Sequence, residues 1–190
     1  MPTRLLRFCL AAVLLLLALP SFAQQQEMVP EEYTGVAIGT GGSFGGRTMS
    51  FDFRITRFTT DQEVEQLALL LKEKGQDALR RAMEKLDCGR IHPVGTVGDQ
   101  IAVCRKRQQG PNTVITIVTA RNMSFAELYN SGRSVDYPFG FLQVKLDAES
   151  KGAGQFMMAA KLRFDKKKGN YELESYGNQY IKATNVRPNK

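Results

Sequence analysis

The sequence predicts an α+β fold in which a curved antiparallel β-sheet or an open barrel carries a packed helical hairpin. Three observations indicate this fold class. Apolar and polar residues alternate over residues 49–56, as in a strand with one buried face. Residues 60–86 show two helical repeats of apolar residues. Residues 139–186 contain four apolar runs that are separated by short glycine-containing turns, which is typical of an antiparallel meander.

The helical hairpin is predicted from its start and stop signals. Thr60 and Glu63 have the spacing of a capping box, in which each side chain satisfies a free backbone N–H group. Gly75 ends this helix, and a second helix is predicted over residues 77–86. Each helix carries one apolar stripe, so we expect both to pack on the sheet.

The strands are predicted from short apolar or alternating runs between turn residues. Residues 105–112 are basic and contain glycine and proline, so we expect a turn there. The predicted strands cover residues 33–38, 49–56, 90–94, 101–103, 113–119, 139–146, 155–164, 171–175 and 180–186.

Length and composition exclude several classes of protein. The chain has 190 residues, of which 43% are hydrophobic and 24% are charged. This balance excludes wholesale disorder and a collagenous, coiled-coil or polytopic membrane protein. The length suits one α+β domain over residues 33–190, preceded by a flexible lead-in over residues 24–32.

Residues 1–23 have the layout of a secretory signal peptide. A positively charged start precedes an apolar run over residues 8–19, and small residues precede the bond between Ala23 and Gln24. The alternative, an uncleaved membrane anchor, requires an apolar run of about 20 residues. We therefore expect cleavage after Ala23 and export to the periplasm or the medium. No segment of the mature chain approaches membrane-spanning length.

Cys88 and Cys104 remain after this cleavage and flank a predicted hairpin. The ends of a hairpin lie close together, and an exported protein meets an oxidising compartment. We therefore expect a disulfide between the two residues. The alternative is a pair of buried free thiols.

Two features that suggest catalysis have simpler structural interpretations. The glycine-rich segment 39–46 resembles the phosphate-covering loop of protein kinases, but the other kinase motifs are missing from the sequence, so we interpret it as a hairpin loop. His92 is the only histidine, and any site of the Ser-His-Asp or Cys-His type requires it as the base. Its place inside a predicted strand favours a structural role. We predict no catalytic residue, no cofactor and no metal site.

Charged residues leave two further alternatives open. A pair of carboxylates for hydrolysis, with Glu172, Glu174 and Asp136 as candidates, depends on spatial separation that a sequence does not reveal. The basic residues in 161–168 form a predicted hairpin tip. A nucleic-acid module would interleave aromatic residues with these charges in a recognised fold, and Tyr171 alone is thin support for one, so we expect no nucleic-acid partner. Lysines at such a tip prevent edge aggregation or contact anionic envelope components.

Two segments resemble a group of short exported bacterial proteins that have no assigned function. They are residues 133–146 (RSVDYPFGFLQVKL) and residues 173–187 (LESYGNQYIKATNVR). The resemblance implies export and a single domain. It assigns no functional residue.

The functional hypothesis is an exported, non-enzymatic protein that binds a lipid or another apolar ligand on the concave face of its sheet. A mostly apolar concavity with few polar groups is what such a ligand requires. The alternatives are a small hydrolase that depends on carboxylates or His92, and an envelope-associated protein-interaction module. The sequence leaves the oligomeric state open. The side chains expected to line the ligand space are Phe51, Phe53, Met157, Met158 and Phe164.

Overall fold

A computed structural model describes residues 29–40, 45–121, 123, 136–176 and 181–189. The predicted signal peptide and part of the predicted glycine-rich loop lie outside these residues. The described strands are β1 (Glu31–Gly39), β2 (Thr48–Ile55), β3 (Gly89–Pro93), β4 (Asp99–Gln109), β5 (Asn112–Thr119), β6 (Phe139–Leu146), β7 (Gly152–Asp165), β8 (Asn170–Ser175) and β9 (Ile181–Pro188). The described helices are α2 (Asp61–Lys74) and α3 (Gln76–Met83).

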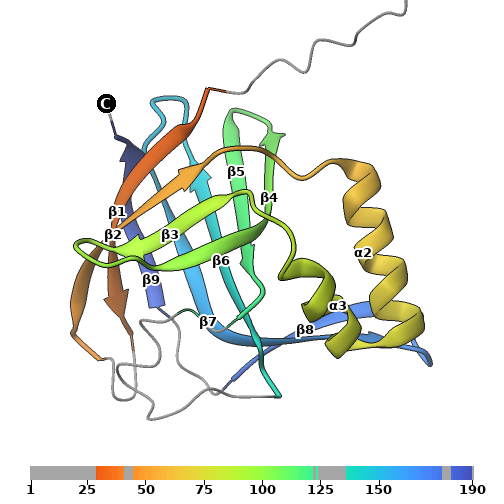
Figure 1. Cartoon of the computed structure of the whole chain (residues 1–190). Coiled ribbons are helices and arrows are strands. Elements are labelled where there is room, and N and C mark those ends of the chain that lie inside the picture. Colours follow the sequence, from red (N-terminus) through yellow and green to blue (C-terminus); the bar gives the residue numbers. More distant parts are fainter. Residues whose placement is uncertain (1–28, 41–44, 122, 124–135, 177–180, 190) are drawn as a thin grey trace, which may run out of the picture.

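The strands form a closed barrel (Figure 1). They lie in the order β6-β5-β4-β3-β2-β1-β9-β7-β8, and β6 also pairs with β7. All pairs are antiparallel. Because β6 pairs with β7, eight strands close on themselves, and β8 is an extra strand attached to β7. The predicted antiparallel sheet and its two helices are confirmed, but the barrel is closed rather than open. Closure depends on pairing between β1 and β9, which lie at opposite ends of the chain.

Strand β7 belongs partly to the barrel and partly to an extension. Its first half pairs with β6 and β9, whereas the residues from Ala160 onward pair with β8. Gly154 permits the close approach of β7 to β6, because a Cβ atom there would lie 2.1 Å from the carbonyl oxygen of Gln143. The β7–β8 hairpin extends from the barrel and runs beside the helices (Figure 1).

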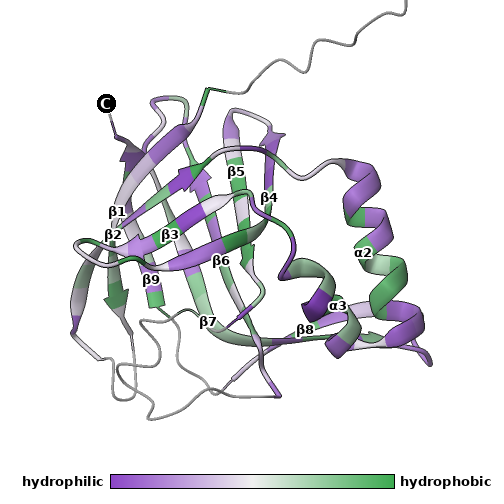
Figure 2. Ribbon diagram, viewed as in Figure 1, coloured by the Kyte–Doolittle hydropathy of each residue, from purple (hydrophilic) through white to green (hydrophobic). Residues whose placement is uncertain are grey.

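Described side chains on the inner strand faces pack together inside the barrel. Along the strands hydrophilic and hydrophobic residues alternate (Figure 2), and the inward residues are buried. Phe51 and Phe156 meet edge to face with ring centroids 4.9 Å apart, and Tyr33 stacks on Phe53 at 4.8 Å. An eight-stranded barrel is just wide enough for side chains to fill its interior, and these buried rings occupy part of that space.

The two helices cover part of the outer wall of the barrel. Leu71, Leu79 and Met83 form a second apolar cluster with Val118 and Phe139 of the wall. The predicted capping box is present, since Thr60 accepts from the backbone N–H of Glu63 and the Glu63 carboxylate accepts from that of Thr60. None of the described helices combines the length and the apolar character that a membrane crossing requires.

The helices are also tied to the β7–β8 hairpin. The side-chain oxygen of Gln76 accepts a hydrogen bond from the backbone N–H of Leu162 at 3.0 Å. The hydroxyl of Tyr171 donates to the carbonyl of Ala68 at 3.1 Å. These bonds hold the extension against the helical pair.

The predicted disulfide is wrong, because Cys88 and Cys104 are both free thiols in the barrel interior. The thiol of Cys88 donates to the carbonyl of Ala102 at 3.4 Å. Cys88 therefore lies beside Ala102 of β4, which is two residues before Cys104. The hydroxyl of Thr59 lies 3.5 Å from the Cys88 sulfur and accepts from the backbone N–H of Cys104 at 3.0 Å. The register of the hairpin and the Thr59 side chain therefore keep the two sulfurs from bonding.

Candidate functional site

Three of the predicted ligand-lining residues lie inside the barrel. Phe51 and Phe53 on β2 are 0% and 1% exposed, and Met158 on β7 belongs to the same buried cluster. These side chains contact one another and their apolar neighbours within that cluster. The structure brings these three side chains together within the buried core, and their role in lining a ligand space stays a prediction.

The other two predicted residues lie outside the barrel. Met157 follows the alternation of β7 and faces outward, where it is half-buried. Phe164 lies on the extension, with its ring 5.0 Å from that of Tyr171 and with the ammonium group of Lys72 5.3 Å from its centroid. Phe164 therefore helps to attach α2 to the extension.

Met157 lines an open groove on the outer wall of the barrel, with a volume of about 540 Å³. Phe141 and Leu173 supply its other large apolar side chains, and Lys145 is its charged residue. Small and neutral polar residues complete the lining: Thr116, Gln143, Ala153, Gly154 and Gln155.

The register of β6 and β7 produces this groove. Phe141 is opposite Met157, Gln143 is opposite Gln155, and Lys145 is opposite Ala153. Outward residues on two neighbouring strands therefore form adjacent rows. The small side chain of Ala153 leaves open space beside Lys145 on the barrel surface. On strand β8, Leu173 provides an apolar side chain at the border of the groove.

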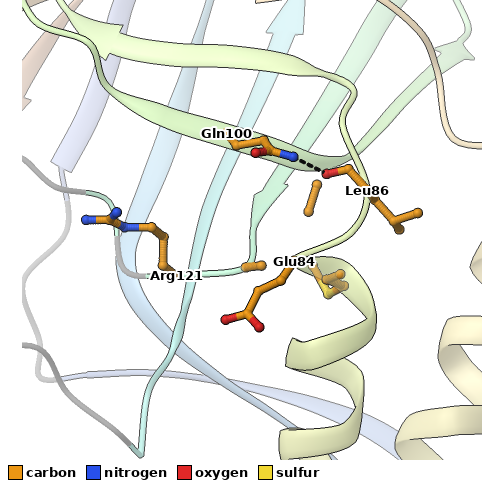
Figure 3. Close-up of a pocket in the computed structure, with 7 residues that line it drawn as sticks. Glu84, Leu86, Gln100 and Arg121 are labelled. Carbon is orange, nitrogen blue, oxygen red and sulfur yellow. Dashed lines mark hydrogen bonds between the residues drawn. The ribbon is translucent and has the colours of Figure 1, made fainter.

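A second, smaller pocket of about 110 Å³ lies between the end of α3 and strand β4 (Figure 3). Its polar groups are engaged with neighbours. The side chain of Gln100 donates a hydrogen bond to the carbonyl of Leu86 at 2.6 Å. The Glu84 carboxylate forms an ion pair with Arg80. Arg121 forms an ion pair with the buried Asp99 carboxylate at 3.2 Å. Ligand sites usually measure about 300 Å³ or more, so this pocket is too small for a drug-sized molecule.

The single histidine lies on the outer face of β3. Its Nδ1 atom is 3.1 Å from the carbonyl oxygen of the adjacent Pro93. Asp52 is opposite His92 in the strand register, but the structure shows no hydrogen bond or ion pair between the two side chains. Within the described part of the chain, no group of three or more His, Cys, Asp and Glu side chains is arranged to hold a metal ion.

The candidate carboxylates of the extension have cationic or phenolic partners. Glu172 accepts from Lys168 and Arg163, each at 2.8 Å, and hydrogen bonds from these two groups lower the pKa of this carboxyl. Glu174 accepts from the hydroxyl of Tyr137, and this bond raises the pKa of the phenol. The lowered pKa of the Glu172 carboxyl suits ion pairing rather than the general-acid role that glycoside hydrolysis requires.

Comparison of the chain with protein-family models, with curated proteins and with solved structures finds no match.

The outer groove is the part of the site that sequence reasoning missed, apart from Met157. A signal for it was present in the alternation of Phe141, Gln143 and Lys145, which marks one face of β6 as outward. The contribution of Leu173 had no such signal, because it depends on the course of the β7–β8 extension.

Proposed function

We propose that this protein is an exported, non-enzymatic binding protein that holds an apolar ligand in the groove on the outer wall of its barrel. The observation that carries the proposal is the groove of about 540 Å³ bordered by Phe141, Met157 and Leu173. This size falls within the usual range for small-molecule sites, as does a lining of apolar side chains with a few polar groups. The ligand class is the one expected from the sequence.

The energetic cost of making space favours the outer wall over the concave inner face as the site of the proposed ligand. Ligand entry between β2 and β7 displaces rings such as Phe51 and Phe156, both 0% exposed. Loss of the packing of one such ring costs about 3–5 kcal/mol. The outer groove is already open to solvent, so binding there carries no comparable cost.

Fluorescence titration with the neutral apolar dye N-phenyl-1-naphthylamine tests this function. We expect the dye to bind the wild-type protein, and Leu173→Gln to weaken binding. Leu69→Gln is the matched control, because Leu69 is 49% and Leu173 is 42% exposed and Leu69 lies on α2. Absence of binding to the wild type, or equal loss in the two variants, refutes the proposed site.

Export is tested by the mass of the protein recovered from its own cell envelope. We expect a chain that begins at Gln24, because the bond after Ala23 follows the pattern of a signal-peptidase site. Native mass spectrometry of the same material is expected to show a co-purified lipid or other apolar molecule. Retention of residues 1–23 contradicts export by this route, and an unliganded mass contradicts the binding function.

A second candidate function is protein interaction through β8. Among the described strands, β8 alone pairs on one side only, and Tyr171 and Leu173 are exposed on it. A free strand edge accepts an added strand from a partner. Cross-linking in cells from a photoreactive residue placed at Asn170 is expected to capture an envelope protein under this function and nothing under ligand binding alone.

A further inference from the structure

The barrel wall that contains the groove carries positive charge and no acidic residue. Strands β5, β6 and β9 and residues 152–160 of β7 contain neither Asp nor Glu. Their charged residues are Lys145, Lys182 and Arg187. A wall with one sign of charge attracts a ligand of the opposite sign.

One of these cations lines the groove, and a second lies on the strand beside it. Lys145 lines it directly, and Lys182 is opposite Gln155, which also lines it. Both lysines are exposed, and neither has a hydrogen bond or ion pair with a described residue. Their ammonium groups are therefore available to a ligand.

The carboxylates close to this wall form hydrogen bonds or ion pairs with groups other than Lys145 and Lys182. Asp147, which follows β6, accepts from the backbone N–H groups of Glu149 and Lys151 at 2.9 Å each. Glu149 pairs with the side chain of Lys151 at 3.0 Å. Glu172 and Glu174 on β8 have the partners described above. No described acidic side chain forms an ion pair with Lys145 or Lys182.

The apolar and basic parts of the groove are separated along its length. Phe141 and Lys145 are four residues apart on β6, a distance of about 13 Å at the rise of a strand. Phe141, Met157 and Leu173 provide apolar contact at one end, and Lys145 and Lys182 provide positive charge farther along the wall. An extended acyl chain that ends in an acid group matches both features at once.

We infer that the ligand is a single-chain amphiphile with a carboxylate head, as in a monomeric fatty acid, and that Lys145 and Lys182 bind its head. This inference rests on the proposed function of the groove and specifies its ligand class. The chain lies over Phe141 and Met157, and the carboxylate accepts hydrogen bonds from the lysine ammonium groups. Such charge-assisted bonds are stronger than neutral ones.

Competition between dodecanoate and N-phenyl-1-naphthylamine tests the inference, with dodecanol as the uncharged ligand of equal chain length. We expect dodecanoate to displace the dye at a lower concentration than dodecanol does. Lys145→Gln is expected to weaken dodecanoate binding about fivefold, and the double variant with Lys182→Gln to weaken it further. Neither variant is expected to change the binding of dodecanol, which carries no charge. High salt is expected to reduce the preference for dodecanoate over dodecanol, because it screens the lysine charges.

Lys166→Gln is the matched control, because it removes the same charge from the β7–β8 turn, away from the groove. Equal displacement by dodecanoate and dodecanol overturns the inference and leaves the apolar site intact. An equal loss of dodecanoate binding in Lys166→Gln also overturns it, because net charge then accounts for the effect. If the protein binds anionic phospholipid vesicles but not dodecanoate, the inference is overturned, and the lysines then contact a membrane surface rather than a monomeric fatty acid. If neither dodecanoate nor dodecanol displaces the dye, the proposed function of the groove as an apolar-ligand site fails as well.

Discussion

Gly35 provides a test of whether the barrel interior is filled. This residue lies on β1 beneath the ring of Phe51. A Cβ atom added at Gly35 would lie 2.8 Å from Cζ of Phe51 and 3.0 Å from Cγ2 of Val186. Phe51 is 0% exposed, and Phe156 packs edge to face against it, so its ring has little room to move. Gly35→Ala therefore overfills the interior.

The magnitude follows from two opposing contributions to the free energy of unfolding. Overpacking of this kind costs about 1–3 kcal/mol. Replacing glycine restricts the unfolded chain and offsets this by about 0.4–1 kcal/mol. We expect Gly35→Ala to destabilise the protein by about 1–2 kcal/mol. Phe51→Leu removes the ring atoms closest to the new methyl group, so the double variant is expected to lose about 1 kcal/mol less than the sum of the single losses.

Urea unfolding followed by far-ultraviolet circular dichroism measures these free energies, since the chain has no Trp for a fluorescence signal. A shift of the midpoint at constant slope indicates a change in stability alone. Additivity of Gly35→Ala and Phe51→Leu within about 0.3 kcal/mol refutes the packing argument. A neutral Gly35→Ala also refutes it, because the interior then has space for an extra group.

Three further results follow from local contacts. Burial, together with Cys88, raises the pKa of Cys104 far above its usual value, so this thiol is expected to resist alkylation in the native protein. Cys88 is expected to resist it because its side chain is buried. Both thiols are expected to react after unfolding, and labelling of the native protein contradicts this prediction. Thr60→Ala is expected to cost about 1 kcal/mol in urea unfolding by removing a helix cap. The backbone N–H of Thr60, aided by Arg57, lowers the pKa of the Glu63 carboxyl. The stability from ionised Glu63 is therefore present above the unfolded-state pKa and is lost as pH falls through the folded one. Glu63→Gln should thus destabilise the protein at neutral pH and have little effect in acid, and an equal cost at both pH values contradicts this.

Local features of the fold were predictable because their causes lie within a few residues. The capping box at Thr60 and the glycine that ends α2 involve neighbours in the sequence, and both are present. The alternation in β2 identified Phe51, Phe53 and Ile55 as one buried face. In each case a hydrogen bond or a strand period relates residues that are close along the chain.

Predictions failed where distant segments decide the outcome. Residues 105–112 were expected to form a turn, but β4 continues to Gln109 because its residues pair with β5 as far as Asn112. The disulfide failed because Thr59, outside the hairpin, places its hydroxyl beside Cys88 and bonds the backbone of Cys104. Neither effect is visible in the sequence of the hairpin.

By itself, the sequence determined where the helical pair begins, which faces of several strands are apolar, and that these strands form an antiparallel sheet. The tertiary structure alone decided that the sheet closes, that Phe51 and Phe156 pack together in its interior, and that Met157 lies with Leu173 beside an open groove. The physical reason is the range of the interactions. Periodicity and capping act between near neighbours, whereas closure and the groove depend on pairing between strands that are far apart along the chain.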